Sequence, residues 1–305
     1  MTILGSHMNA RTISPTQSAA RTSTQSPLWL WFGLILIAVW WSISWLAVRP
    51  LSDFSFFPLW LGYILTVDGW LARRSGTSPI ARSGWKIAWL FVLSAPFWWL
   101  FEAINLRIDN WHYHHPRSYS DFAYVLWSSI AFSTVIPAVL TTAELVRSFG
   151  IRSPRWLPAW NPGRAGLIAI AAVAAASLAL LLVFPEVLFP LTWLSLFFIF
   201  DPIGRLLGAR TLSSYVAEGD WSPAINLALA GLVCGWFWEM WNFYAMPKWT
   251  YAVPHADWLH VWEMPLLGYG GYIPFAFEVY AIYALAVHRL DRSALPKVEL
   301  SDPSN

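Results

Sequence analysis

The sequence predicts an all-α integral membrane protein with eight transmembrane helices. Of its 305 residues, 57% are hydrophobic and only 12% are charged, whereas soluble domains carry about 25% charged residues. Apolar runs of about 20 residues recur along the chain, and a helix of that length crosses the hydrocarbon core of a bilayer. The sequence shows no long alternating pattern of the kind that marks the strands of a membrane barrel.

The expected spans follow these apolar runs in chain order. The first begins directly after Pro27, and the later runs are separated by segments that contain Pro, Gly or charged residues. Residues 1–27 are polar and are expected to be disordered, residues 1–7 resemble a cloning remnant, and residues 291–305 form a cytoplasmic tail. The eight spans are residues 28–48, 54–72, 86–106, 121–147, 165–184, 187–207, 222–245 and 263–288.

The basic residues orient these helices, because Lys and Arg concentrate in the cytoplasmic loops of membrane proteins. With the N-terminus inside, the only Lys and Arg in outer loops, out of 19, are Arg49, Arg107, Arg117 and Lys248. The sequence therefore predicts cytoplasmic termini and a multi-pass protein of a bacterial inner membrane. The net charge of +2 comes from loops and does not indicate nucleic acid. The single cysteine, Cys234, excludes an intrachain disulfide and a cysteine-based metal site.

A motif of the form Trp-x-aromatic-Glu-x-x-Asn occurs twice, beginning at Trp99 and at Trp236. In both copies Trp-x-Tyr follows, and a proline stands three residues after that tyrosine. Other pairs at nearly constant separation are Pro58 with Pro190, Asp68 with Asp201, and Pro137 with Pro274. This repeat predicts two four-helix units, residues 28–150 and 165–290, joined by the Pro-rich basic linker 151–164. Because four is even, the units are expected to be parallel, related by an axis along the membrane normal.

Each copy places a carboxyl and an amide on one helical face near the outer end of a span: Glu102 with Asn105, and Glu239 with Asn242. A carboxyl inside a membrane costs several kcal/mol unless it is protonated, paired or hydrated. One interpretation is a polar site between the units, in which the glutamates act as general acids and the asparagines bind substrate. The alternative is that each pair holds helices together through backbone and indole groups. The sequence leaves both interpretations open.

Four aromatic residues, Trp111, Tyr113, Trp249 and Tyr251, begin the two outer loops. Trp and Tyr gather at membrane interfaces in any case, but their repetition at matched spacing favours contact with a substrate. Aromatic faces beside a carboxyl suit a lipid headgroup, a polyene chain or a developing carbocation.

The outer loops also contain several histidines, of which His255 and His260 are candidates for substrate contact. Histidines at this density could bind a metal, but their spacing fits no closed zinc pattern and the cluster is not repeated. A solvated or pH-sensitive loop is the preferred interpretation, so neither a metal nor a cofactor is expected.

Three more acids lie within the expected spans. Asp68 and Asp201, toward the cytoplasmic ends, have arginines nearby and are interpreted as anchors of those ends. Glu278, at a depth similar to that of Asp201, has Thr141 at its matched position in the first unit. Glu278 is therefore a candidate substrate-binding residue of the second unit.

The pattern Glu-x-x-Asn, then Trp-x-Tyr, then the span that begins Pro274-Phe275-Ala276-Phe277-Glu278 resembles small membrane carotenoid enzymes, namely lycopene-cyclase-domain proteins and carotenoid hydratases. In the cyclase domain adjacent glutamates follow the proline, whereas here the single Glu278 does. The resemblance covers about a third of the chain. It implies a cofactor-free acid–base reaction on a long apolar substrate.

Three functions remain open at this stage. The chain could be an intramembrane enzyme that hydrates, cyclises or isomerises an isoprenoid or other lipid, with Glu239 or Glu102 as the acid. It could be a non-enzymatic transporter or channel whose two units move around a central site. It could also be a lipid- or pigment-binding partner subunit. The expected partner is a membrane lipid or an apolar small molecule, not nucleic acid, and the sequence is compatible with a homo-oligomer.

Overall fold

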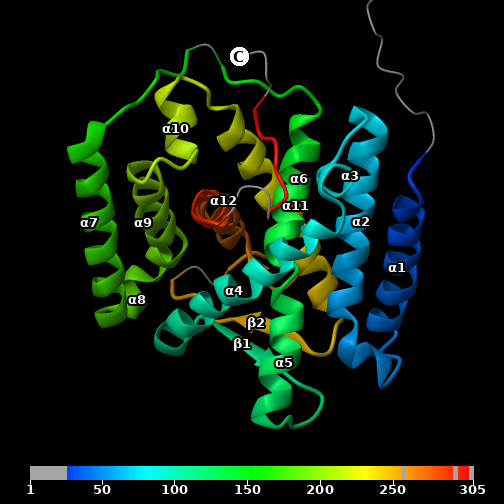
Figure 1. Cartoon of the computed structure of the whole chain (residues 1–305). Helices are drawn as coiled ribbons and strands as arrows, with labels where there is room; N and C mark the ends of the chain where they lie inside the picture. Colours follow the sequence, from blue (N-terminus) through cyan, green and yellow to red (C-terminus); the bar gives the residue numbers. More distant parts are fainter. Residues whose placement is uncertain (1–25, 155, 256–257, 291–294, 302–305) are drawn as a thin grey trace, which may run out of the picture.

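The computed structural model describes residues 26–154, 156–255, 258–290 and 295–301, and it is mostly helical, as predicted (Figure 1). The expectations for residues 1–7, and for most of the N-terminal segment, fall outside these residues. The helices are α1 (Leu28–Trp45), α2 (Phe56–Ser75), α3 (Pro79–Ser83), α4 (Ala88–Ile108), α5 (Asp121–Phe132), α6 (Val135–Arg147), α7 (Gly163–Val183), α8 (Pro185–Leu188), α9 (Thr192–Leu206), α10 (Leu212–Ala217), α11 (Ser222–Phe243) and α12 (Tyr272–Arg289).

Seven helical segments among the described residues are long and apolar enough to cross a membrane, which makes the chain a multi-pass membrane protein. They are Leu28–Trp45, Pro79–Ile108, Asp121–Arg147, Gly163–Val183, Pro185–Leu206, Ser222–Phe243 and Leu266–Arg289. These segments match seven of the eight expected spans. The remaining one is α2, a continuous helix that is not among the seven because Asp68, two arginines, two tryptophans and a tyrosine lower its mean hydropathy.

Helix α2 lies directly beside α1 at one edge of the molecule (Figure 1). The two backbones approach closely where Gly33 meets Gly62: a Cβ atom on Gly33 would lie 2.7 Å from the carbonyl oxygen of Gly62. Small residues at such a crossing allow van der Waals contact between helices in a membrane, where no hydrophobic effect drives them together. This contact attaches α1 to the rest of the molecule.

Helices α2, α4, α6, α11 and α12 surround a core of large aromatic side chains. The ring of Trp60, which is fully buried, lies 5.0 Å from Trp238 and 5.1 Å from Trp241 between ring centroids. The ring of Phe275 on α12 lies 6.0 Å from Trp238 and 5.9 Å from Phe97 on α4. Aromatic pairs in such tilted and edge-to-face geometries stabilise a core beyond their buried area. The tryptophan-rich composition therefore builds an aromatic cluster between segments far apart in the chain.

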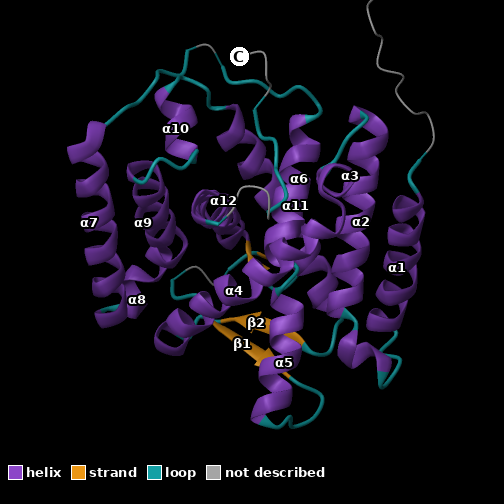
Figure 2. Ribbon diagram, viewed as in Figure 1, coloured by secondary structure: helices purple, strands orange, loops and turns teal. Residues whose placement is uncertain are grey.

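The described residues also contain two short antiparallel sheets (Figure 2). Strand β1 (Trp111–His114) pairs with β2 (Lys248–Tyr251), and β3 (His260–Val261) pairs with β4 (Met264–Pro265). In the first sheet Trp111 lies opposite Tyr251, and Tyr113 lies opposite Trp249. The two Trp-x-Tyr segments, expected to begin separate loops, thus pair with each other.

Asp68 and Asp201 each hold the first turn of the short helix that follows. Asp68 accepts hydrogen bonds from Ser78 Oγ at 2.6 Å and from Ile80 N at 3.0 Å, at the start of α3. Asp201 accepts from Ser213 N at 3.2 Å, at the start of α10. A helix N-terminus has unpaired N–H groups and favours a negative charge. Both carboxylates therefore anchor the N-terminus of a short helix, a partner that sequence reasoning did not indicate.

Replacing Asp68 with alanine is expected to destabilise the protein by about 1–3 kcal/mol, because Ser78 and the Ile80 amide lose their acceptor in a buried place. Trp29 Nε1, which donates to the same carboxylate at 3.1 Å, loses its partner as well. The measurement is thermal unfolding in detergent. Asp121, an exposed acid in the first turn of α5, is the matched control, and Asp121→Ala should cost no more than about 1 kcal/mol. Equal losses in both variants would contradict the anchoring role of Asp68.

Candidate functional site

Glu102 lies near the end of α4 and receives three hydrogen bonds on a single oxygen. Its Oε1 accepts from Tyr113 Oη at 2.7 Å, from Trp98 Nε1 at 2.8 Å and from Trp111 Nε1 at 3.1 Å. Trp98 is one turn earlier on the same helix, and the other two donors come from β1. The Glu102 residue is partly exposed. The carboxyl is thus fixed through one oxygen at the edge of the aromatic cluster.

Glu239 on α11 has a related but buried environment. Its Oε1 accepts from Tyr251 Oη of β2 at 2.7 Å and from Tyr272 Oη of α12. The side chain has no solvent exposure, and its Oε2 has no hydrogen-bond partner among the described residues. Both glutamates therefore bind the tyrosine of the strand that follows them in the chain, but only Glu102 reaches the surface.

The two asparagines hold the strands in place. Asn242 Nδ2 donates to the carbonyl of Trp249 at 2.7 Å, and Asn242 Oδ1 accepts from the amide of Trp249 at 2.9 Å. Asn105 makes the same pair of contacts with Trp111, at 2.8 and 3.3 Å. Each side-chain amide therefore binds both the N–H and the C=O group of one strand tryptophan. This arrangement fixes each Trp-x-Tyr segment relative to its glutamate.

A glycine explains why the donors to the two glutamates differ. At the position where α4 carries Trp98, four residues before Glu102, α11 carries Gly235, four residues before Glu239. A Cβ atom on Gly235 would lie 2.3 Å from Cδ2 of Tyr272. The missing side chain leaves space for the Tyr272 ring, which stacks on Trp238 with centroids 5.9 Å apart. A tyrosine from α12 thus supplies the second hydrogen bond to Glu239.

The strand tyrosines remain neutral donors over a wide pH range. Burial, together with the nearby Glu102 carboxylate, raises the pKa of Tyr113 well above its ordinary value. Burial and the Glu239 carboxylate raise the pKa of Tyr251 in the same way. A phenol that stays protonated donates a hydrogen bond to the carboxylate. Both glutamates therefore keep their tyrosine donors at any physiological pH.

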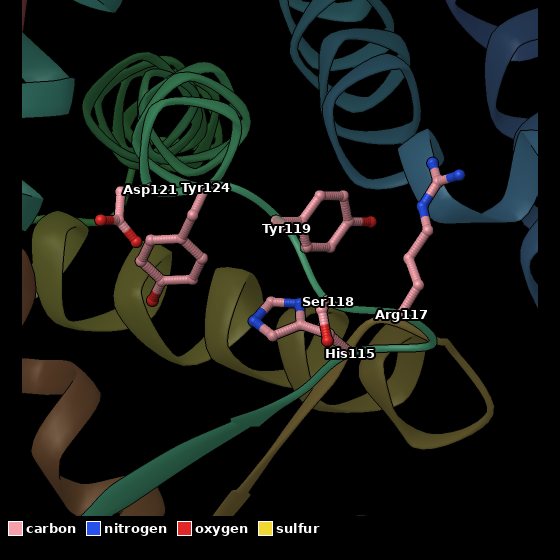
Figure 3. Close-up of a pocket in the computed structure, with 6 residues that line it drawn as sticks. All are labelled: His115, Arg117, Ser118, Tyr119, Asp121 and Tyr124. Atoms are coloured by element: carbon pink, nitrogen blue, oxygen red, sulfur yellow. The ribbon is translucent and has the colours of Figure 1, made fainter.

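A cavity of about 470 Å³ lies beside β1, lined by His115, Arg117, Ser118, Tyr119, Asp121 and Tyr124 (Figure 3). The His115 ring stacks on Tyr113 with centroids 6.4 Å apart, so the cavity is separated from Glu102 by the Tyr113 ring. Burial, followed by the neighbouring His114, lowers the pKa of His115, which favours the neutral imidazole. Arg117 extends away from His115 and pairs with Asp53 at 3.4 Å. The cavity therefore presents hydroxyl, imidazole and aromatic groups next to the Glu102 site.

The remaining candidates lie apart from the two glutamates. His255 and His260 are exposed on the segment between β2 and α12. Glu278 is fully buried in α12 and accepts from the amide of Phe197 on α9 at 3.4 Å. It is six residues beyond Tyr272, about 9 Å along the helix. Among the described residues no group of three His, Cys, Asp or Glu is placed to hold a metal.

Sequence reasoning missed three contributors to the site: Trp98, Tyr272 and the direct pairing of β1 with β2. Trp98 carried a usable signal, because residues four apart on a helix share one face. Tyr272 carried none, because its ring occupies a space that exists only where Gly235 meets α12.

Comparisons of the chain with protein-family models, curated proteins and solved structures found no match.

Proposed function

We propose that this membrane protein is a cofactor-free acid–base enzyme that acts on an isoprenoid or other lipid, with Glu102 as the proton donor. The observation that carries this proposal is the partly exposed Glu102 carboxyl, held through Oε1 by three donors beside a cavity and an aromatic cluster. A general acid must come within hydrogen-bond reach of its substrate. Glu102 is partly exposed and is separated from the cavity only by the Tyr113 ring, whereas Glu239 is enclosed by Tyr251 and Tyr272.

The proposed reaction begins when the protonated Glu102 carboxyl transfers its proton to a carbon–carbon double bond of the lipid. The resulting carbocation is stabilised by the surrounding aromatic rings, among them Trp98 and Trp111. Loss of a proton to the Glu102 carboxylate then gives an isomer or a ring. Alternatively, a water molecule adds to the cation and returns its extra proton to Glu102, which gives an alcohol.

The architecture proposed with this function is the one that the repeat predicts. Helix α2 is the eighth crossing, the two four-helix units are parallel, and the basic ends of the helices face the cytoplasm. Three matched sets of contacts support this proposal: glutamate to strand tyrosine, asparagine to strand tryptophan, and aspartate to the following short helix. The carotenoid enzymes that the sequence resembles are proposed as the nearest functional parallel.

The test compares lipids from membranes of an isoprenoid-producing host that contain the wild-type chain, Glu102→Gln, or no chain. Chromatography coupled to mass spectrometry is expected to find, with the wild type only, an isomer of unchanged mass but different retention time, or a product heavier by one water. Glu102→Gln should reduce its formation by about 100-fold or more, the usual contribution of a general acid. The exposed Glu186 at the start of α8 provides the control, and Glu186→Gln should retain the product.

Identical lipid profiles for wild-type and empty membranes would exclude the enzymatic proposal. A lipid that co-purifies equally with wild type and Glu102→Gln, without conversion, would identify a binding subunit.

A second candidate, a transporter, is favoured by one observation: hydroxyl and thiol groups of Tyr63, Thr142 and Cys234 meet in the interior between α2, α6 and α11. This cluster lies between the level of Glu239, five residues after Cys234 on α11, and the level of Asp68, five residues after Tyr63 on α2.

A further inference from the structure

Residues 295–301, red in Figure 1, lie between α6 and α11 at the end of the molecule away from β1 and β2. The main chain of this segment is hydrogen-bonded to side chains of the helices around it. Tyr283 Oη donates to the carbonyl of Pro296 at 2.8 Å and accepts from the amide of Val298 at 2.9 Å. Asn226 Nδ2 donates to the carbonyl of Leu300 at 3.4 Å. Two helices, α11 and α12, thus bind the segment's main chain.

Charged groups of the first 150 residues hold the same segment from the other side. Glu144 on α6, which has no solvent exposure, accepts from the amide of Glu299 at 3.1 Å. Arg82 on α3 donates to Glu144 Oε2 at 2.8 Å and to the carbonyl of Lys297 at 2.9 Å. The side chain of Leu300 is 1% exposed. Residues 296–300 are thus bound by four helices, α3, α6, α11 and α12.

Next to the segment, along α6 and α11, lie buried polar groups that we call the polar seam: Glu144, Thr142, Tyr63, Cys234 and Glu239. Two residues before Glu144, Thr142 Oγ1 lies 2.9 Å from Tyr63 Oη on α2 and 3.6 Å from Cys234 Sγ on α11. All three side chains are buried. At 1.5 Å per residue, Glu144 lies about 3 Å from this cluster along α6, and Glu239 lies about 7.5 Å from it along α11. Along the helix axes, the hydroxyl and thiol groups thus lie between two buried carboxyls.

The seam has further capacity for hydrogen bonds. The indole nitrogens of Trp60 and Trp241, the hydroxyl of Thr141 and Oε2 of Glu239 are buried and have no hydrogen-bond partner among the described residues. The centroid of the Trp60 ring lies 5.0 Å from that of Tyr63, and Trp60 also contacts the ring of Trp238. Trp238 in turn stacks on Tyr272, whose hydroxyl donates to Glu239. Buried polar groups of this kind are commonly satisfied by internal water.

We propose that residues 295–300 form a plug that closes one end of this polar seam, and that displacement of the plug admits water and protons to the groups between Glu144 and Glu239. The plug contacts helices on both sides of the seam, so its departure removes main-chain bonds to α3, α6, α11 and α12 together. This inference does not depend on the chemistry of Glu102.

The test uses the full chain and a variant that lacks residues 295–305, each reconstituted in liposomes that contain a pH-sensitive dye. With an imposed potassium diffusion potential, the full chain should show the proton uptake of empty liposomes, and the shortened chain should be about tenfold faster. The single cysteine gives a second readout. Cys234 should react with a small thiol reagent about tenfold faster in the shortened chain, because labelling of a buried thiol follows the population of open states.

Two variants provide controls. Lys297→Ala keeps the backbone contacts, because the Lys297 side chain is exposed and only its carbonyl is bound, so it should behave as the full chain does. Leu300→Asp should behave as the shortened chain does and replaces it if the truncation does not fold. A peptide of residues 291–305 added to the shortened chain should return both proton uptake and Cys234 labelling to the slow rates of the full chain. A folded plug variant with unchanged proton uptake and unreactive Cys234 would overturn the proposal.

Discussion

Replacing Gly235 with alanine is expected to displace Tyr272 from Glu239 and to destabilise the protein by about 1–3 kcal/mol, as overpacking of a well-packed core does. An alanine Cβ would lie within 2.3–2.6 Å of three ring atoms of Tyr272. The ring cannot retreat freely, because it is stacked on Trp238. The hydroxyl that donates to Glu239 therefore moves with the ring, and a buried carboxyl loses one of its two tyrosine donors.

The measurement is thermal unfolding in detergent, and a double-mutant cycle identifies the cause. In a Tyr272→Ala background the clash no longer exists, so Gly235→Ala should cost little there. Gly270→Ala is the matched control, because a Cβ atom on Gly270 would meet nothing within 4 Å. Equal destabilisation by Gly235→Ala in the presence and absence of the Tyr272 ring would show that the glycine serves another purpose.

The repeated motif identified the residues that meet at each glutamate, although its aromatic residues were interpreted as substrate contacts and not as contacts within the protein. Its spacing brings the strand tyrosine to the glutamate and the asparagine to the strand tryptophan in both copies. These contacts join residues close in the chain, so a pattern within one segment is sufficient to indicate them. The same reasoning located seven of the eight expected spans among helices apolar enough to cross a membrane, and the eighth as helix α2.

The different exposure of the two glutamates could not be predicted from the motif. Glu102 and Glu239 stand in nearly the same local sequence, yet Glu102 is partly exposed and Glu239 is fully buried. One element that covers Glu239 is Tyr272, which lies 33 residues further along the chain and reaches it through the space at Gly235. Burial at such a site depends on which distant element covers it, and sequence periodicity carries no information on that.

Glu144 was missed for a similar reason. It lies near the end of an expected span, where a charged residue would ordinarily be read as solvated. It pairs locally with Arg147 at 3.8 Å, but its hydrogen-bond partners Arg82 and the amide of Glu299 are 62 and 155 residues away along the chain. Arg82 and the C-terminal segment were both interpreted as loop or tail. Their association with Glu144 is a tertiary feature, and it forms the polar end of the structure opposite the strands.

Replacing Asn242 with alanine is expected to destabilise the protein by about 3 kcal/mol, because the amide and carbonyl of Trp249 both lose their partner, and each unsatisfied buried group costs about 1–3 kcal/mol. Asn242 is 2% exposed, so water cannot easily replace it. Asn105→Ala should also destabilise the protein, because it removes the same pair of contacts from Trp111, which is 4% exposed.

The consequence of Asn242→Ala should extend to the strand itself. Once Trp249 is released, β2 is no longer fixed relative to α11, and Tyr251 loses its alignment with Glu239. Hydrogen exchange measures this directly: the amides of residues 249–251 should exchange much faster in Asn242→Ala, since local opening becomes easier when backbone bonds are removed. The amides of β1 should respond less, because Asn105 still holds Trp111. If exchange in β2 is unchanged while the protein is destabilised, Asn242 contributes only to packing within α11 and does not position the strand.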